Sequence, residues 1–185
     1  MNHDAAASPA ARWDAAASPP DQASRRSGMV TVLYAEHALG LIRLAHIMLG
    51  NRNAAEDVVQ EAFLGLFRRW EHLHDPDKAL GYVRSSVLNG CRSQLRRHRA
   101  VELEPSHQPP ASSAEAALMT EEERREILSA LRALPVRQRE VLALRFYFDL
   151  PDQEIADALG ISKSTVRSTA HRGVRALGRT LGTSS

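Results

Sequence analysis

The chain has 185 residues, a formal net charge of +2 and 25% charged residues. This length suits one or two small domains, and the low net charge means that nucleic acid would have to be bound by local basic clusters. The single cysteine, Cys91, excludes an internal disulfide and a multi-cysteine metal site, which fits a reducing cytoplasm. No apolar run approaches the roughly 20 residues of a membrane span, and the N-terminus lacks the apolar core of a secretory signal. We therefore expect a cytoplasmic protein with no membrane partner.

The first 28 residues are rich in Ala, Ser and Pro and show no periodicity that would bury a face. Such a segment is expected to be disordered. It ends just before Met29, so the sequence leaves open whether Met1 or Met29 is the native start. We take residues 29–99 as the first domain.

Two amphipathic helices open this domain. Apolar residues recur every three or four positions from Leu33 until Gly50-Asn51 ends the pattern. Asn53, with Glu56 three residues on, resembles a capping arrangement for a second helix that runs to Trp70. Its polar face carries Asp57, Gln60 and Glu61. From physics alone, acids in the first turn are most simply explained by the helix dipole.

A third helix is expected from about Lys78 to Arg99, after a loop whose two histidines lack a third metal ligand. The inward-facing side chains of this helix include Cys91, which is expected to be a small, buried apolar residue. Five arginines and no acid lie between Leu80 and Arg99. This composition indicates a nucleic-acid surface. The residues predicted to bind there are Tyr82, Asn89, Arg92, Arg96 and Arg97.

Residues 100–119 contain three prolines and three glutamates without Lys or Arg, and are predicted to be a flexible acidic linker. A capping box at Thr120 and Glu123 then opens the second domain, residues 120–182. A further helix, from about Arg137 to Phe148, is expected to bury Phe146. No segment reads as a strand, so the predicted fold is all-α, with two small helical domains.

The segment Pro151–Leu177 reads as a helix-turn-helix. Gly160 can adopt the positive φ of a tight helix exit, and Ser162 can cap the next helix. In that helix Val166, Ala170 and Val174 are expected to face inward. The outward residues, predicted to contact duplex DNA, are Lys163, Ser164, Arg167, Ser168, His171, Arg172 and Arg175. The alternative, a solvated amphipathic helix, would normally mix charge signs, whereas five basic residues and no acid lie between Lys163 and Leu181.

Three segments together carry a resemblance to a known family: AAEDVVQEAFLGLFRRW at 54–70, ALGYVRSSVLNGCRSQLRRHR at 79–99, and LPVRQREVLALRFYFDLPDQEIADALGISKSTVRSTAHRGVRAL at 134–177. They resemble bacterial RNA polymerase sigma factors of the extracytoplasmic-function (ECF) group, in both order and spacing. The run RSTAHRG at 167–173 is similar to that of actinobacterial, sigma-E-like members.

The resemblance implies a non-enzymatic initiation subunit without cofactor or metal. Its partners would be core RNA polymerase, through clamp helices and flap, and promoter DNA, both duplex and single-stranded. Asp57, Gln60 and Glu61 would dock on the polymerase. The first domain would recognise the minus-ten element and hold its melted strand, and the helix-turn-helix would read the minus-thirty-five element. The linker would thread the polymerase cleft.

Some questions stay open at this point. Thr169 and Ala170 stand where family members often carry a basic and a large apolar residue, so the promoter sequence does not follow. The signal, and whether an anti-sigma factor exists, are also undetermined. The runner-up hypothesis is a self-sufficient regulator with an N-terminal sensing or dimerising domain, but residues 30–99 offer a basic helix instead of a ligand pocket. An enzyme is disfavoured because no catalytic constellation or phosphate loop is found.

Overall fold

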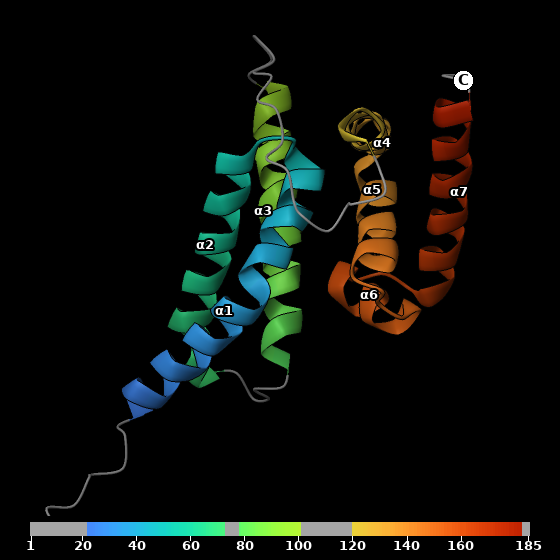
Figure 1. Cartoon of the computed structure of the whole chain (residues 1–185). Helices are drawn as coiled ribbons and strands as arrows, with labels where there is room; N and C mark the ends of the chain where they lie inside the picture. The colour runs from blue at the N-terminus through green and yellow to red at the C-terminus, as the bar shows by residue number, and fades with distance from the viewer. Residues whose placement is uncertain (1–21, 73–77, 101–119, 183–185) are drawn as a thin grey trace, which may run out of the picture.

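The computed structural model describes residues 22–72, 78–100 and 120–182. Every regular element within these ranges is helical, which confirms the all-α prediction (Figure 1). The elements are α1 (Gln22–Leu49), α2 (Arg52–Arg69), η1 (Trp70–His72), α3 (Ala79–Ala100), α4 (Glu121–Ala133), α5 (Val136–Leu142), the π-helical η3 (Ala143–Tyr147), α6 (Asp152–Leu159) and α7 (Lys163–Gly182).

The N-terminal unit begins earlier than the sequence suggested. Helix α1 starts at Gln22, so the last seven residues of the expected disordered extension, 22–28, are helical. Arg26 explains why they are ordered: its guanidinium lies 4.3 Å from the ring centroid of Phe67 and 3.3 Å from a carboxylate oxygen of Glu71. The boundary at residue 29 is therefore wrong for the fold. Residues 1–21 lie outside the described part of the chain.

Helices α1, α2 and α3 pack around an apolar core to form this unit (Figure 1). The largest fully buried side chains in it are Leu41, Leu44, Met48, Val59, Leu66, Val83, Val87 and Leu88. Helices α2 and α3 approach closely at Gly90, where an added Cβ would lie 2.7 Å from Val58 Cγ1. Cys91 is fully buried, as predicted.

The length and apolar composition of helix α1 differ from the expectation drawn from the sequence. By length and composition, its segment Arg26–Leu49 would suffice to cross a membrane. Its apolar side chains Leu41, Leu44 and Met48 are instead fully buried among the other helices. Core packing therefore accounts for these three side chains, whereas Val32 and Leu39 of the same helix are 55% and 59% exposed.

The junction between α1 and α2 differs by two residues from the predicted cap. Gly50 ends α1 with a φ of 73°, a conformation that glycine adopts without a steric penalty. Asn51 then takes extended backbone geometry and its side chain accepts a hydrogen bond of 2.9 Å from the backbone N–H of Ala54. Asn51, and not Asn53, is the N-cap, because α2 already begins at Arg52.

The C-terminal unit contains α4 to α7. The capping box at Thr120 and Glu123 is present as predicted. Phe146 is 69% exposed, which corrects its assignment to the core. The wider turn of η3 shifts the side-chain register relative to an α-helix. Phe148 is brought inward instead, with its ring beside Gly40 of α1.

The two units share one buried cluster rather than standing apart. Ser85 Oγ of α3 donates a hydrogen bond of 3.1 Å to the Ala158 carbonyl of α6, and Arg84 lies 3.3 Å from Glu154. Arg139 of α5 donates to the Met48 carbonyl at the end of α1 and to carbonyls near the end of α4. The expectation of two domains holds only as two packed units, and the predicted flexible linker lies outside the described residues.

Candidate nucleic-acid interface

The helix-turn-helix is built by α6, a tight turn and α7. Gly160 ends α6 in the left-handed conformation, with a φ of 63°, and the Ile161 N–H donates to the Ala156 carbonyl at 3.0 Å. Ser162 caps α7 by accepting from the Thr165 N–H at 3.1 Å. Ile155 of α6 and Val166 of α7 are fully buried between the helices. The turn and the cap are therefore as predicted.

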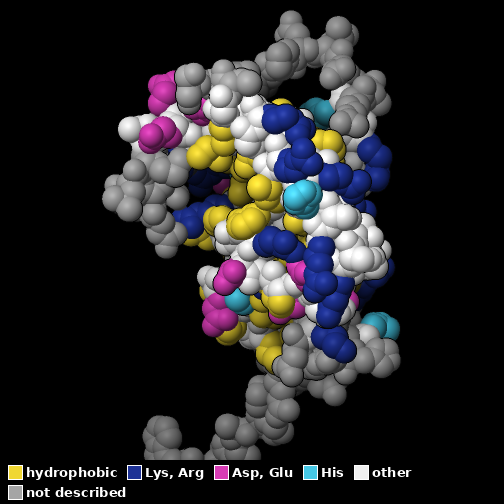
Figure 2. Space-filling model, turned by 90° about the vertical axis from the view of Figure 1, so that its right-hand side faces the viewer, with side chains coloured by type: hydrophobic (Ala, Val, Ile, Leu, Met, Phe, Trp, Pro, Cys, Tyr) yellow, Lys and Arg dark blue, Asp and Glu magenta, His cyan; other side chains and the backbone are white. Residues whose placement is uncertain are grey.

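All seven side chains that the sequence assigned to duplex DNA lie on the exposed surface of α7. They are Lys163, Ser164, Arg167, Ser168, His171, Arg172 and Arg175. Helix α7 contains no acidic residue. Figure 2 shows Lys and Arg side chains running along the face of the molecule on which α7 lies. The structure thus supplies a continuous basic helix surface, open to a partner.

The inward face of α7 is rotated from the predicted one. Val174 is 49% exposed, whereas Thr169 and Gly173 are buried together with Val166 and Ala170. The buried positions follow steps of three and four because α7 packs against α5 as well as α6. At Gly173 an added Cβ would lie 3.0 Å from Leu142 Cδ1, so glycine permits this close crossing.

A carboxylate from α6 contacts one of the basic side chains. Asp152 Oδ2 accepts a hydrogen bond of 2.8 Å from Arg167 Nε, while its Oδ1 accepts from Arg145 Nη2 of η3. The hydrogen bond from Arg167, together with the charge of Arg145, lowers the pKa of the Asp152 carboxyl below its usual value. Arg167 itself remains largely exposed, with 71% of its side chain accessible.

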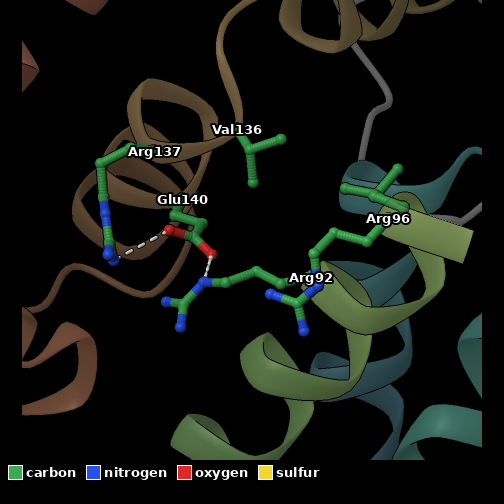
Figure 3. A pocket seen from close by; sticks show the side chains of 6 residues that line it. Arg92, Arg96, Val136, Arg137 and Glu140 are labelled. Atoms are coloured by element: carbon green, nitrogen blue, oxygen red, sulfur yellow. Dashed lines mark hydrogen bonds and ion pairs between the residues drawn. The ribbon is translucent and has the colours of Figure 1, made fainter. Parts of the chain in front are cut away.

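The predicted strand-binding residues on α3 do not all face open solvent. Arg92 Nε lies 2.5 Å from Glu140 Oε1 of α5, and Arg137 Nη1 lies 3.2 Å from the other oxygen (Figure 3). Arg92 also donates to Asn89 Oδ1 at 2.7 Å, while Arg96 donates to Ser93. A cavity of about 240 Å³ lies between α3 and α5 beside these side chains. Part of the basic face of α3 is thus covered by the C-terminal unit.

Tyr82 and Arg97 lie on another side of α3. They line a hollow of about 390 Å³ between α2 and α3 together with Asp57 and Glu61. Two of the predicted polymerase contacts therefore share a groove with two predicted DNA contacts. Gln60 is exposed on α2. In the described ranges no group of three His, Cys, Asp or Glu side chains could hold a metal ion.

Comparison with known proteins assigns the family. Residues 33–101 match Sigma-70 region 2, and residues 124–177 match Sigma-70, region 4. The chain is 34% identical over 170 residues to the ECF RNA polymerase sigma factor SigL of Mycobacterium tuberculosis, covering 86% of this chain and 92% of that protein. The chain is an RNA polymerase sigma factor of the ECF group.

Further relatives agree with this assignment. RNA polymerase sigma-E factor of Streptomyces coelicolor is 33% identical over 137 residues, covering 74% of this chain and 77% of the relative. Among solved structures, CnrH in complex with the cytosolic domain of CnrY has a TM-score of 0.67 at 23% identity, covering 88% of this chain and 96% of CnrH. RpoE of Bartonella quintana in complex with the anti-sigma factor NepR has a TM-score of 0.68 at 20% identity, covering 85% and 96%. These two structures support the fold.

The sequence did not predict the roles of three polar residues that link helices of the sigma factor. Glu140, Asp152 and Arg139 each find their partners across a tertiary contact, 48 residues away for Glu140 and Arg92. No local pattern marks such a pair. The nearest signal was the position of Arg139 and Glu140 directly before the apolar Val141 and Leu142 in α5, since a charge buried beside apolar residues needs a partner.

Proposed function

We propose that this sigma factor binds core RNA polymerase, reads a two-part promoter and stabilises its melted strand. At family level, promoter-directed transcription initiation by a non-catalytic subunit follows from the two sigma regions. The main support for promoter recognition is the outer face of α7, which is exposed, contains no acidic residue and follows a tight turn. A helix of this shape and charge suits the major groove of duplex DNA.

In the proposed division of labour, α7 reads the minus-thirty-five element as duplex. Ser164, Arg167, Ser168 and His171 lie in its first half and would reach base edges, while Lys163, Arg172 and Arg175 would contact phosphates. Base contacts determine sequence preference, and phosphate contacts contribute salt-dependent affinity. The unit of residues 120–182 is therefore proposed as the upstream reader.

Helix α3 is proposed to hold the melted minus-ten strand through Tyr82, Asn89, Arg92, Arg96 and Arg97. Stacking on aromatic side chains and contacts to phosphates contribute about 1–3 kcal/mol per base on single-stranded DNA, against a cost of a few kcal/mol for extruding a base. Because Arg92 pairs with Glu140 in the present arrangement, strand binding by this side chain requires α3 and α5 to separate. Core polymerase is the proposed agent of that separation.

Polymerase docking is proposed for Asp57, Gln60 and Glu61 on α2. Asp57 and Gln60 are exposed, and Glu61 meets Arg68 at 3.3 Å on the surface. Exposed ion pairs of this kind contribute little to stability. These carboxylates are therefore available to basic side chains of a clamp, and the flap is the proposed partner of the C-terminal unit. Residues 100–119 would connect the two units through the polymerase cleft.

An anti-sigma factor is a further proposed partner. The related folds of CnrH and RpoE were each solved with a second protein, the cytosolic domain of CnrY and the anti-sigma factor NepR. A protein that held α3 and α7 away from DNA would keep this chain inactive. The proposed location is the cytoplasm, where core polymerase and promoter DNA are found.

Run-off transcription tests the proposal. Purified core polymerase is assayed with and without this protein on a broad set of promoter templates, and promoter-specific transcripts are expected only with it. A holoenzyme that forms but adds no specific transcript on any template would contradict the proposal.

Two variants test the two DNA-binding helices separately. Arg167→Ala is expected to weaken upstream binding, whereas Asn89→Ala should reduce opening of the promoter duplex and be partly rescued by a template with a preformed bubble. Permanganate footprinting of melted thymines separates the two steps.

A further inference from the structure

Asp152 and Arg167 form a contact within the helix-turn-helix that no sequence motif marks. We propose that Asp152 is a positioning residue for base recognition: it holds Arg167 so that the terminal nitrogens of the guanidinium face one guanine of the upstream element. The inference rests on the proposed function of α7 as the duplex reader. It adds the base class that Arg167 selects and the residue that enforces the selection.

The carboxylate of Asp152 lies on the protein side of the Arg167 guanidinium. Asp152 is the first residue of α6, and its side chain is 22% exposed, against 71% for Arg167. Arg145, 28% exposed, binds Oδ1 of the carboxylate from the protein side. Arg167 Nε binds Oδ2 at 2.8 Å from the solvent side. The carboxylate is therefore anchored inward and presents one oxygen outward to Arg167.

This arrangement leaves a defined set of donors on Arg167. A guanidinium has five N–H donors in a planar fork, and the bond to Asp152 uses the one on Nε. The four N–H groups on the two terminal nitrogens stay available. Their spacing matches O6 and N7 of guanine, the commonest specific contact of arginine in the major groove. Holding Nε in advance also reduces the rotamer freedom that Arg167 loses on binding.

The charge of Asp152 adds discrimination. The carboxyl is ionised at neutral pH, as an aspartate usually is, and the hydrogen bond from Arg167 is the main cause that lowers its pKa further. A fixed negative charge beside the reading helix repels DNA phosphates and weakens binding that makes no base contact. Helix α7 contributes no acid of its own. Asp152 thus favours the correct sequence by orienting Arg167 and disfavours other sequences by repulsion.

A purely structural role is the competing explanation. An acid in the first turn of α6 also interacts favourably with the helix dipole. Glu154 provides a matched control, because it lies in the same first turn and pairs with Arg84 at 3.3 Å rather than with Arg167. If the dipole were the only role, Asp152→Asn and Glu154→Gln would alter stability and leave base preference unchanged.

The test uses holoenzyme assembled from the full chain and core polymerase. Promoter duplexes with a randomised upstream element are bound, recovered and sequenced, and binding to a fixed non-promoter duplex is titrated in parallel. The unsubstituted protein and Glu154→Gln are expected to prefer guanine at one position by about tenfold or more. Arg167→Ala and Asp152→Asn should each reduce that preference to about twofold or less. Asp152→Asn should also bind the non-promoter duplex about two- to fivefold more tightly, because a negative charge is lost.

The possible outcomes separate this inference from the proposed function. If Arg167→Ala removes the guanine preference and Asp152→Asn keeps it, the positioning role is wrong while α7 remains the reader. If the unsubstituted holoenzyme shows no upstream preference at all, the reading role of α7 fails, and the inference fails with it. Should Asp152→Asn not fold, Arg145→Gln, which frees the carboxylate on its inner side, is expected to reduce the same preference. An unaltered preference in that variant would overturn the positioning role.

Discussion

Arg92 Nε lies 2.5 Å from Glu140 Oε1, and this contact joins the proposed strand-binding helix to the C-terminal unit (Figure 3). The Glu140 side chain is only 1% exposed, and its second oxygen meets Arg137 at 3.2 Å. The carboxylate thus occupies the Nε donor of Arg92, a side chain that the proposed function assigns to the melted DNA strand. Glu140 and a DNA phosphate cannot both use that donor.

Glu140→Gln is expected to strengthen binding of the full chain to a single-stranded oligonucleotide severalfold. The amide removes the charged competitor from Arg92, while its similar shape still fills the site. The free energy of unfolding should fall by about 1–3 kcal/mol, because charged hydrogen bonds within the interface are weakened. Fluorescence anisotropy and urea unfolding measure the two effects.

Glu122→Gln controls for the change in net charge, because Glu122 is 89% exposed and pairs within α4, with Arg125 at 3.6 Å. Equal strand affinity for folded Glu140→Gln and Glu122→Gln would show that Glu140 does not compete with DNA.

Arg139→Met is expected to be among the most destabilising single substitutions at the contact between the two units. Arg139 is 6% exposed and donates to the carbonyls of Met48, Arg132 and Leu134. Losing these bonds leaves carbonyls at two helix ends without a donor, at a cost of about 3 kcal/mol or more in the free energy of unfolding.

Arg139→Lys should not restore stability, because an ammonium cannot reproduce the planar fork of donors. Arg175→Met, at an exposed site, is the control and should change the free energy of unfolding by less than about 0.5 kcal/mol. Thermal and urea unfolding measure these changes. If Arg139→Met lowered the free energy of unfolding only slightly, water or other donors would be replacing the guanidinium.

His46 should make the stability of the fold depend on pH. Its two ring nitrogens are buried, and burial, followed by the charges of Arg132, Arg52 and Arg124, lowers its pKa below 6.5, while a backbone hydrogen bond at Asn51 opposes this shift. Between the lowered folded pKa and the unfolded value of 6.5, the unfolded chain binds more protons. The contribution is fully present above pH 6.5 and is lost as pH falls through the folded pKa.

Thermal unfolding from about pH 8 down to about pH 5 measures this dependence. His46→Met should lose less stability over that range than the unsubstituted protein, and His171→Gln, at an exposed position, should behave like the unsubstituted protein. Parallel curves for His46→Met and the unsubstituted chain would assign the pH dependence to other groups.

Two glycines of α3 should respond to alanine in opposite directions. At Gly90 the new methyl group would lie 2.7 Å from Val58 Cγ1, so α2 and α3 must move apart or Val58 must leave its rotamer. Gly90→Ala should therefore cost about 1–3 kcal/mol in the free energy of unfolding. Among the described residues, nothing outside the local backbone of α3 lies within 4 Å of a carbon added at Gly81, and Gly81→Ala should stabilise the helix by up to about 1 kcal/mol. The urea midpoints of the two variants compare their stabilities. If both substitutions stabilised the protein, the Val58 side chain would be able to move aside without cost.

The sequence by itself determined the features that depend on neighbours along the chain. The left-handed exit at Gly160, the cap at Ser162 and the capping box at Thr120 follow from local backbone chemistry. The exposed basic face of α7 follows from helical periodicity and the absence of acids. The order of the helices could be predicted, and the family resemblance recognised, for the same reason.

Tertiary structure decided, at particular positions, which side chains of a helix meet another element. Val174 is exposed because α7 packs against both α5 and α6, and Phe146 is exposed because η3 widens the turn. The pairs Arg92–Glu140 and Arg167–Asp152 join separate helices at 48 and 15 residues' distance. Charged side chains pair with whatever the packing of helices brings near, and that packing results from the apolar core as a whole, so no local pattern encodes these partners.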